Sequence, residues 1–295
     1  QIGNIIIKLE KILVKEQPDL VIVVGDVNST FAGALTAKQL GIKVAHVEAG
    51  LRSFDMSMPE EINRILTDRI SDFLFTTEKS GNENLIKEGI GKDKAFFVGN
   101  VMIDILLRHK EKAQKSDILS KLKLNKNNYA VLTLHRPSNV DNKGAFQNII
   151  SMLEKIQEKI KIIFPVHPRT MKNISLFRLN QKIKNMKNLV LTEPLGYLDF
   201  LCLMSDSKLV LTDSGGVQEE TTVLGVPCVT LRDNTERPIT MEQGTNMLIS
   251  TDKNKVIDKS LKIISNEIKI NGKIPELWDG NAAKRIVDII REDFD

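Results

Sequence analysis

Short, mainly apolar runs recur along the chain and alternate with segments in which apolar residues have helical spacing. Such runs are typical of strands that are buried on both faces of a parallel sheet. The expected strands are 19–24, 43–50, 73–76, 96–99, 129–134, 162–164, 189–191, 209–211 and 227–231. The expected helices are 2–15, 29–40, 60–71, 79–88, 145–159, 197–204, 252–266 and 281–292, with another that begins near Gln218. This alternation predicts an α/β fold.

A polar, lysine-rich stretch at 107–128 divides the alternation into two parts, and we interpret it as a linker. We therefore predict a Rossmann-like domain at 1–108, a nucleotide-binding Rossmann-like domain at 109–278 and a terminal helix at 279–295. Doubly wound sheets bind ligands beyond the carboxyl ends of their strands. Two such sheets that face each other would hold the ligand in a central cleft.

The composition excludes several other classes of protein. The net charge of +4 is spread along the chain and is not gathered with aromatic residues into a basic stripe, which argues against a nucleic-acid partner. No apolar run reaches the length of a membrane span, so no membrane partner is expected. The two cysteines, Cys202 and Cys228, lie in apolar surroundings, which is typical of core residues in a reducing compartment and predicts a cytoplasmic protein.

A glycine turn follows the expected strand 209–211, in the sequence Thr212-Asp-Ser-Gly-Gly216. A strand, a glycine turn and a helix leave unpaired backbone N–H groups at a positive helix end, where a phosphate or diphosphate can bind. Small residues let the backbone approach such a ligand closely. Glu220, one turn into the helix, could contact a ribose. From these residues alone, a tight connection that binds nothing is equally consistent with the pattern.

Polar residues follow nearly every expected strand, at the edge where parallel sheets bind ligands. These residues are Asp26, His46, Glu48, His135, Arg136, His167, Asp213 and Ser214. Each has a structural alternative: Asp26 could cap a helix, His46 could be a hydrogen-bonded core residue, and His167 could belong to a turn. Their common position favours a site at which carboxylates and imidazoles transfer protons.

Two kinds of cofactor site receive little support. The four histidines are dispersed, and neither His-x-x-His nor Cys-x-x-Cys spacing occurs, which argues against a metal site. A lone glycine pair is not the dinucleotide fingerprint, which argues against a nicotinamide cofactor. We predict no cofactor.

The motifs appear in an order that resembles the non-hydrolysing UDP-N-acetylglucosamine 2-epimerases. The matching segments are Gly25-Asp-Val-Asn-Ser-Thr30, His46-Val-Glu-Ala-Gly-Leu-Arg52, Pro59-Glu-Glu-Ile-Asn-Arg64, His135-Arg-Pro-Ser-Asn139, His167-Pro168, Thr212-Asp-Ser-Gly-Gly-Val-Gln-Glu-Glu220, Arg232-Asp-Asn-Thr-Glu-Arg-Pro238 and Asp279-Gly-Asn-Ala-Ala283. Any one of these segments alone would be a weak signal, whereas the ordered set is specific.

The resemblance implies two facing domains like those of B-type glycosyltransferases, with the last helix crossing back to the first domain. It implies a homodimer that interconverts UDP-GlcNAc and UDP-ManNAc for the synthesis of surface polysaccharide precursors. The reaction eliminates UDP to give a 2-acetamidoglucal and then adds UDP back. No metal or redox cofactor is implied.

The resemblance also implies roles for individual residues. The catalytic candidates are Asp26, Glu48, Glu60 and His135. The substrate-binding candidates are Ser214, Gly215 and Gly216 at the diphosphate, Glu220 at the ribose, Arg237 at a further ligand contact and Phe200 near the uracil. Phe200 has an equally weighted alternative as a core residue of a short helix.

Family members begin with a strand–helix–strand segment that does not precede Gln1 in this sequence. We therefore expect an incomplete first domain, which leaves open whether the chain as printed is active. A hydrolysing epimerase that releases free ManNAc and UDP, a glycosyltransferase and a nucleotide-sugar-binding protein without turnover remain as alternatives. Relatives that act on diacetamido-uronic sugars also leave the identity of the sugar open.

Overall fold

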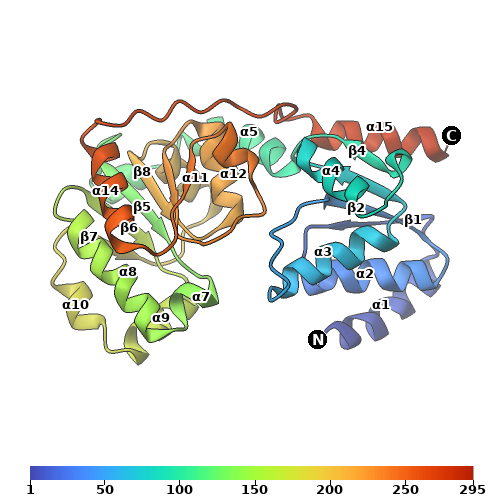
Figure 1. Ribbon diagram of the computed structural model, residues 1–295, viewed down its shortest axis with the longest axis horizontal. Coiled ribbons are helices and arrows are strands. Elements are labelled where there is room, and N and C mark those ends of the chain that lie inside the picture. The colour runs from blue at the N-terminus through green and yellow to red at the C-terminus, as the bar shows by residue number, and fades with distance from the viewer. Residues whose placement is uncertain (295) are drawn as a thin grey trace. The chain divides into compact units, whose positions relative to one another are not determined.

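The computed structural model describes residues 1–294, which form two compact units (Figure 1). The first unit contains Gln1–Asp104 together with the chain from Glu276 onward, and the second contains Ile105–Pro275. The divisions fall a few residues before the expected boundaries at 108 and 278. Within residues 1–294, no helix combines the length and the apolar character needed to cross a membrane.

The first unit is built on a parallel sheet in which the strands follow one another in chain order. The strands are β1 (Leu20–Val24), β2 (Lys43–Ala49), β3 (Phe73–Thr76) and β4 (Ala95–Phe97). The helices are α1 (Ile2–Glu16), α2 (Asn28–Gln39), α3 (Pro59–Ile70), α4 (Lys79–Lys87), a 3-10 turn at Lys92–Lys94, the start of α5 (Val101–Ala113) and α15 (Ala282–Phe294). Leu13 and Ala34 pack with Val44 on one face of the sheet, whereas Ile286 packs with Ala45 and Phe75 on the other.

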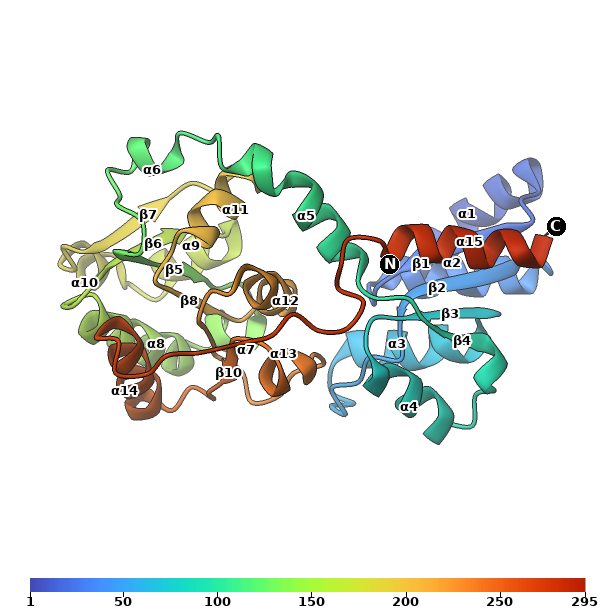
Figure 2. The same ribbon diagram turned by 90° about the horizontal axis from the view of Figure 1, so that it is seen from above.

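Helix α15 runs alongside the sheet of the first unit (Figure 2), and polar contacts as well as packing fix it there. Asp104 accepts hydrogen bonds from the backbone N–H groups of Ala282 and Ala283 at 3.1 and 2.7 Å, as expected for a carboxylate at a helix N-terminus. Nε1 of the buried Trp278 donates to the carbonyl of Thr77 at 2.9 Å. The chain therefore returns to the first unit at its end, as the resemblance implied.

Strand β1 is less buried than its apolar sequence predicts. The apolar run led us to expect a strand covered on both faces, but Ile22 and Val24 are 51% and 50% exposed. The expectation was wrong because α15 covers this face mainly over β2 and β3 and reaches the edge strand β1 only at Leu20. Val23 on the opposite face packs against the helices and is buried.

The second unit contains a parallel sheet in the order β10-β9-β8-β5-β6-β7. The strands are β5 (Tyr129–Thr133), β6 (Lys161–Pro165), β7 (Leu189–Thr192), β8 (Leu209–Thr212), β9 (Cys228–Thr230) and β10 (Asn246–Leu248). The helices after α5 are α6 (Ile118–Lys121), α7 (Pro137–Val140), α8 (Lys143–Ile156), α9 (Pro168–Leu176), α10 (Asn180–Lys184), α11 (Tyr197–Ser205), α12 (Gly215–Leu224), α13 (Ile239–Glu242) and α14 (Lys253–Ile264). Each half of the sheet grows outwards from the central pair β5 and β8, which is the doubly wound arrangement.

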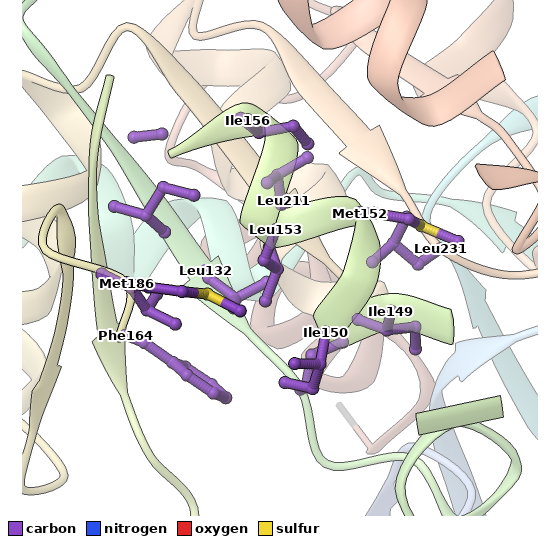
Figure 3. Close-up of a cluster of buried hydrophobic side chains, with 14 of the residues drawn as sticks. Leu132, Ile149, Ile150, Met152, Leu153, Ile156, Phe164, Met186, Leu211 and Leu231 are labelled. Atoms are coloured by element: carbon purple, nitrogen blue, oxygen red, sulfur yellow. The ribbon is translucent and has the colours of Figure 1, made fainter. Parts of the chain in front are cut away.

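The largest hydrophobic core lies between this sheet and helix α8. Figure 3 shows Ile149, Leu153 and Ile156 of α8 in one buried cluster with Leu132 of β5 and Leu211 of β8. The three α8 residues recur with helical spacing, so one apolar stripe of the helix covers the strands. The predicted α/β class is confirmed.

Three local expectations were wrong. Helix α5 continues to Ala113 through the start of the expected linker, because a lysine-rich sequence is compatible with an exposed helix. Helix α12 begins at Gly215 and not near Gln218, so the glycine pair forms the first turn of the helix. Strand β10 was not predicted because its three residues are too short to show a period.

Gly50 provides a test of the packing around the end of β2. Its φ of 78° is unfavourable for other residues, and an added Cβ would lie 2.4 Å from the carbonyl oxygen of Gly81. We expect Gly50→Ala to cost several kcal/mol, about 1 to 2 kcal/mol from the backbone conformation and about 1 to 3 kcal/mol from the clash. Gly89→Ala is the matched control, since Gly89 has a φ of 79° but no atom within 4 Å of the added Cβ. Thermal unfolding of both variants measures the difference, and equal losses would contradict the close approach.

Candidate active site

The centre of the second sheet brings two predicted site segments together. Strands β5 and β8 are neighbours at the point where the direction of the sheet order reverses. His135 follows β5, and Ser214 follows β8. The hydroxyl oxygens of Thr133 and Thr212 lie 2.6 Å apart at these two strand ends. Ligands of doubly wound folds bind at this kind of position.

Asp213 holds His135 in a defined orientation. Its buried carboxylate accepts hydrogen bonds from the backbone N–H groups of His135 and Arg136, at 3.1 and 2.9 Å, and from the side chain of Asn139 at 3.2 Å. Nδ1 of His135 lies 3.1 Å from the carboxylate. Burial alone would raise the pKa of Asp213, but the hydrogen bonds from His135 and Arg136 lower it below its ordinary value. Because the carboxylate is ionised, Nδ1 donates to it and Nε2 of the half-exposed imidazole is left for other partners.

The N-terminus of α12 presents free backbone donors next to this imidazole. Ser214 precedes the helix, and its N–H donates to Oγ1 of Thr212 at 3.0 Å. The N–H groups of the first turn, at Gly215 and Gly216, have no acceptor within the helix. A Cβ at Gly215 would lie 2.7 Å from Oε1 of Glu236. An alanine at Gly215 would displace this carboxylate, whereas glycine leaves the turn open to an anion.

The buried Glu220 and the partly exposed Tyr197 form an acid–phenol pair beside the turn. The Tyr197 hydroxyl donates to Oε1 of Glu220 at 3.1 Å, from α11 to α12. Burial raises the pKa of Glu220 to about 7, and the hydrogen bond from Tyr197 opposes this rise. Phe200 is half-buried on α11, one turn beyond Tyr197. A carboxylate that is costly to ionise gains from donors such as ribose hydroxyls.

Arg237 lies in a buried ion pair. Its Nε lies 2.7 Å from Oε1 of Glu219, and both side chains are buried. The neighbouring Glu236 is buried beside Arg232, with Nη2 to Oε2 at 2.9 Å. Burial would raise the pKa of Glu236, but the charges of Arg237 and Arg232 lower it to about 2. Arg237 thus belongs to a buried ion network next to the first turn of α12.

In the first unit, Asp26 and Glu60 line the same pocket. This pocket has a volume of about 410 Å³, and Asn28, Pro59 and Asn63 also line it. Asp26 follows β1, whereas Glu60 lies in the first turn of α3. Glu48 is not among the residues that line this pocket. The structure therefore brings together two of the three acidic candidates of this unit around one cavity.

Helix α3 fixes the position of Asp26. Nη1 of the buried Arg64 is hydrogen-bonded to Oδ2 of Asp26. Nδ2 of Asn63 donates to the backbone carbonyl of Asp26 at 2.9 Å. Sequence reasoning assigned no role to Arg64 or Asn63. Asn63 and Arg64 lie three and four residues after Glu60. This spacing could have shown that all three side chains lie on one face of the helix.

Glu48 has an unusual backbone conformation. Its φ is 71°, and the register between β2 and β3 shifts between Val47 and Ala49. The left-handed region is costly for a residue with a side chain, and such residues cluster at functional sites. The bulge re-aims the half-buried Glu48 side chain at the end of β2. Among residues 1–294, no group of three or more His, Cys, Asp or Glu is arranged to hold a metal ion.

The raised pKa of Glu220 predicts a pH-dependent effect on stability. A glutamate in the unfolded chain titrates near about 4.3. Its folded pKa is higher, so the stability that the neutral form contributes is present below the unfolded pKa and is lost as the pH rises towards about 7. We expect the stability of Glu220→Gln relative to the wild type to increase by roughly 2 kcal/mol when the pH is raised from 5 to 8.

Urea unfolding of both proteins at pH 5 and pH 8 measures this gain. Tyr197→Phe serves as a second variant, because loss of its hydrogen bond should raise the pKa of Glu220 further and enlarge the loss of stability at high pH. A stability difference between Glu220→Gln and the wild type that is the same at both pH values would contradict the raised pKa.

Comparisons with known proteins identify the family of this chain. The family model for UDP-N-acetylglucosamine 2-epimerase matches residues 1–291. The UDP-N-acetylglucosamine 2-epimerase of Methanocaldococcus jannaschii is 48% identical over 98% of this chain and 80% of its own length. Its crystal structure with UDP-GlcNAc and UDP superimposes with a TM-score of 0.91, covering 99% of this chain and 80% of that one. The UDP-2,3-diacetamido-2,3-dideoxy-D-glucuronate 2-epimerase of Pseudomonas aeruginosa is 37% identical over 98% of this chain and 79% of its length. The chain therefore belongs to the UDP-N-acetylglucosamine 2-epimerase family.

Proposed function

We propose that the protein catalyses the reversible C2 epimerisation of UDP-GlcNAc to UDP-ManNAc by eliminating and re-adding UDP. Family membership supports the substrate class. The observation that carries the proposal is the meeting of the His135 imidazole with the N-terminus of α12 at the centre of the second sheet. An imidazole and free N–H groups at one point suit a diphosphate that leaves and returns.

The second unit would hold the nucleotide. The N–H groups of Gly215 and Gly216 and the Ser214 residue would bind the diphosphate. The imidazolium form of His135, with a proton on each ring nitrogen, would donate from Nε2 to a diphosphate oxygen as negative charge develops there. Glu220 would accept hydrogen bonds from the ribose hydroxyls, and the Phe200 ring would lie near the uracil. These residues would stabilise the negative charge on the departing UDP. They would not take the C2 proton themselves.

The first unit would supply the groups that move the C2 proton. In the elimination a carboxylate takes the proton from C2, the C1–O bond breaks, and UDP leaves with the electron pair of that bond. The product is 2-acetamidoglucal. In the return step an acid donates a proton to the opposite face of C2 while UDP adds to C1. Asp26, Glu48 and Glu60 are the candidates, and inversion requires proton carriers on both faces.

A UDP-linked diacetamido-uronic sugar is a second candidate substrate. The relative from Pseudomonas aeruginosa is named for a diacetamido-uronic sugar, and it matches this chain along 98% of its length. The same elimination would apply to that sugar, because the chemistry takes place at C1 and C2. We also propose a homodimer that serves the synthesis of surface polysaccharide precursors, as the resemblance implies, and a cytoplasmic location, as the two cysteines suggest.

Proton NMR in deuterated water tests the reaction. We expect incubation with UDP-GlcNAc to give UDP-ManNAc and to replace the C2 hydrogen of both UDP-sugars by deuterium. Asp26→Asn, Glu48→Gln and Glu60→Gln should each slow this exchange by about 10²- to 10⁴-fold. Glu83→Gln, an exposed acidic residue of α4, is the matched control in the same unit. Free ManNAc with UDP would indicate a hydrolysing epimerase, and UDP binding without exchange would indicate a binding protein.

Calorimetry with UDP tests the diphosphate site separately. Gly215→Ala should weaken UDP binding by at least about tenfold, because the new methyl group would cover the first helical turn and meet Glu236. Gly196→Ala is the control, since its added Cβ meets no atom within 4 Å. Unchanged affinity in Gly215→Ala would contradict a diphosphate at this turn.

A further inference from the structure

His46 is a fully buried histidine with an oxygen acceptor at each ring nitrogen. Nδ1 lies 2.6 Å from Oδ1 of Asp68, and Nε2 lies 2.9 Å from the backbone carbonyl of Gly25. The three groups come from three elements, since His46 lies on β2, Asp68 on α3 and Gly25 directly after β1. His46 therefore links strand β2 and helix α3 to Gly25, the residue before Asp26.

The two acceptors determine how many protons the ring carries. A backbone carbonyl cannot donate a hydrogen bond, so Nε2 must be protonated. Oδ2 of Asp68 accepts from the Gly50 N–H at 3.1 Å and lies 2.7 Å from Nη1 of Arg52, which are partners of an ionised carboxylate. Nδ1 must then donate to Oδ1. A neutral ring would place a nitrogen lone pair against an oxygen lone pair inside the protein.

The charged groups around the ring favour the imidazolium. Burial alone would lower the pKa of His46, but Asp68, the Gly25 carbonyl and Glu48 together raise it above its ordinary value. Asp68 faces the ring from α3, Glu48 acts on it from the same strand, and Arg52 lies on the far side of Asp68. Arg52 is in turn paired with Glu88 at 2.7 Å, so the positive charge of Arg52 is shared between two carboxylates.

We propose that His46 is a permanently protonated positioning residue that fixes the Gly25–Asp26 peptide and holds a positive charge beneath the acidic side of the site. The proposal rests on the proposed epimerase function for its effect on rate. Gly25 has a φ of 72° and no atom within 4 Å of a Cβ position, so sterics do not fix this turn. Its N–H donates to Val47 at 3.0 Å, and the carbonyl is held by His46.

This role differs from that of an ordinary core histidine. A core histidine would need one donor and one acceptor and would be satisfied when neutral. Here the carbonyl before Asp26 receives a charge-assisted hydrogen bond, which is stronger than a neutral one. Loss of this bond would free the peptide that orients the Asp26 carboxylate, while the contact of Arg64 with the same carboxylate would remain. The effect should therefore appear in catalysis and not in nucleotide binding.

Long-range proton–nitrogen NMR of the wild-type protein labelled with ¹⁵N-histidine tests the charge directly. The chain has four histidines, and the single variants H109Q, H135N and H167N assign the other three rings. We expect both ring nitrogens of His46 to remain protonated from pH 6 to pH 9. A ring that is neutral at pH 8, or that titrates near about 6.5, would overturn the proposal.

Kinetics of His46→Gln test the positioning role. Glutamine is neutral and can donate to the Gly25 carbonyl but cannot also donate to Asp68. We expect kcat for C2 exchange to fall by about 10- to 100-fold, with KM within about threefold and UDP affinity unchanged. Ser71→Ala is the control, because it removes another buried hydrogen bond of the same unit, from Ser71 to Thr67 at 2.8 Å, and should leave kcat unchanged.

The two experiments separate the possible failures. A His46→Gln protein that folds and retains the wild-type kcat would overturn the positioning role. If the wild type itself shows no C2 exchange, the proposed function fails, whereas the NMR result still decides the protonation state of His46. If His46→Gln does not fold, the NMR measurement on the wild type carries the test alone.

Discussion

Buried carboxylates that accept backbone N–H groups hold the strand-end loops of this protein in place. Asp213 accepts from the backbone of His135 and Arg136, Asp68 from Gly50, and Glu61 from Ser53 and Phe54. A buried charge is tolerated only when its lone pairs are satisfied, so each carboxylate selects one conformation of the loop that it binds. Asp213 holds the loop after β5 although it follows β8, and Asp68 holds the end of β2 although it lies nearest β3 in sequence, whereas Glu61 holds the loop that leads into its own helix. The positions of the site residues therefore depend on contacts between elements and not on the loops themselves.

The locally unfavourable features gather at the same strand ends. Glu48 has a φ of 71°, a Cβ at Gly215 would lie 2.7 Å from the Glu236 carboxylate, and burial raises the pKa of Glu220 to about 7. Each feature costs stability in the unliganded chain, and the surrounding packing offsets that cost. A ligand that donates to Glu220 and fills the turn before α12 would relieve part of it. This pattern is expected where selection has favoured binding over stability.

The candidate site shows how far sequence reasoning extends. The motif around Thr212 to Gly216 predicted an anion site, because a glycine turn between a buried strand and a helix leaves unpaired N–H groups at the helix N-terminus. The pairing of Asp26 with Arg64 was not predicted, since 38 residues separate them. The ion pair of Arg237 with Glu219 was not predicted, because it depends on the path of a loop that has no periodic signal. Residue types therefore indicated where chemistry is possible, whereas the hydrogen-bond and ion-pair partners of these residues could be identified only from the fold.

The sequence by itself determined the alternation of strands and helices, the α/β class and the presence of polar residues at the strand ends. These follow from hydrophobic period and from glycine and proline positions, which act over a few residues. Only the tertiary structure decided that β5 and β8 are neighbours, that β1 is an edge strand and that His46 lies between Asp68 and Gly25. Strand order and the protonation of a buried ring depend on groups distant in the chain, because packing and electrostatics act through space and not along the sequence.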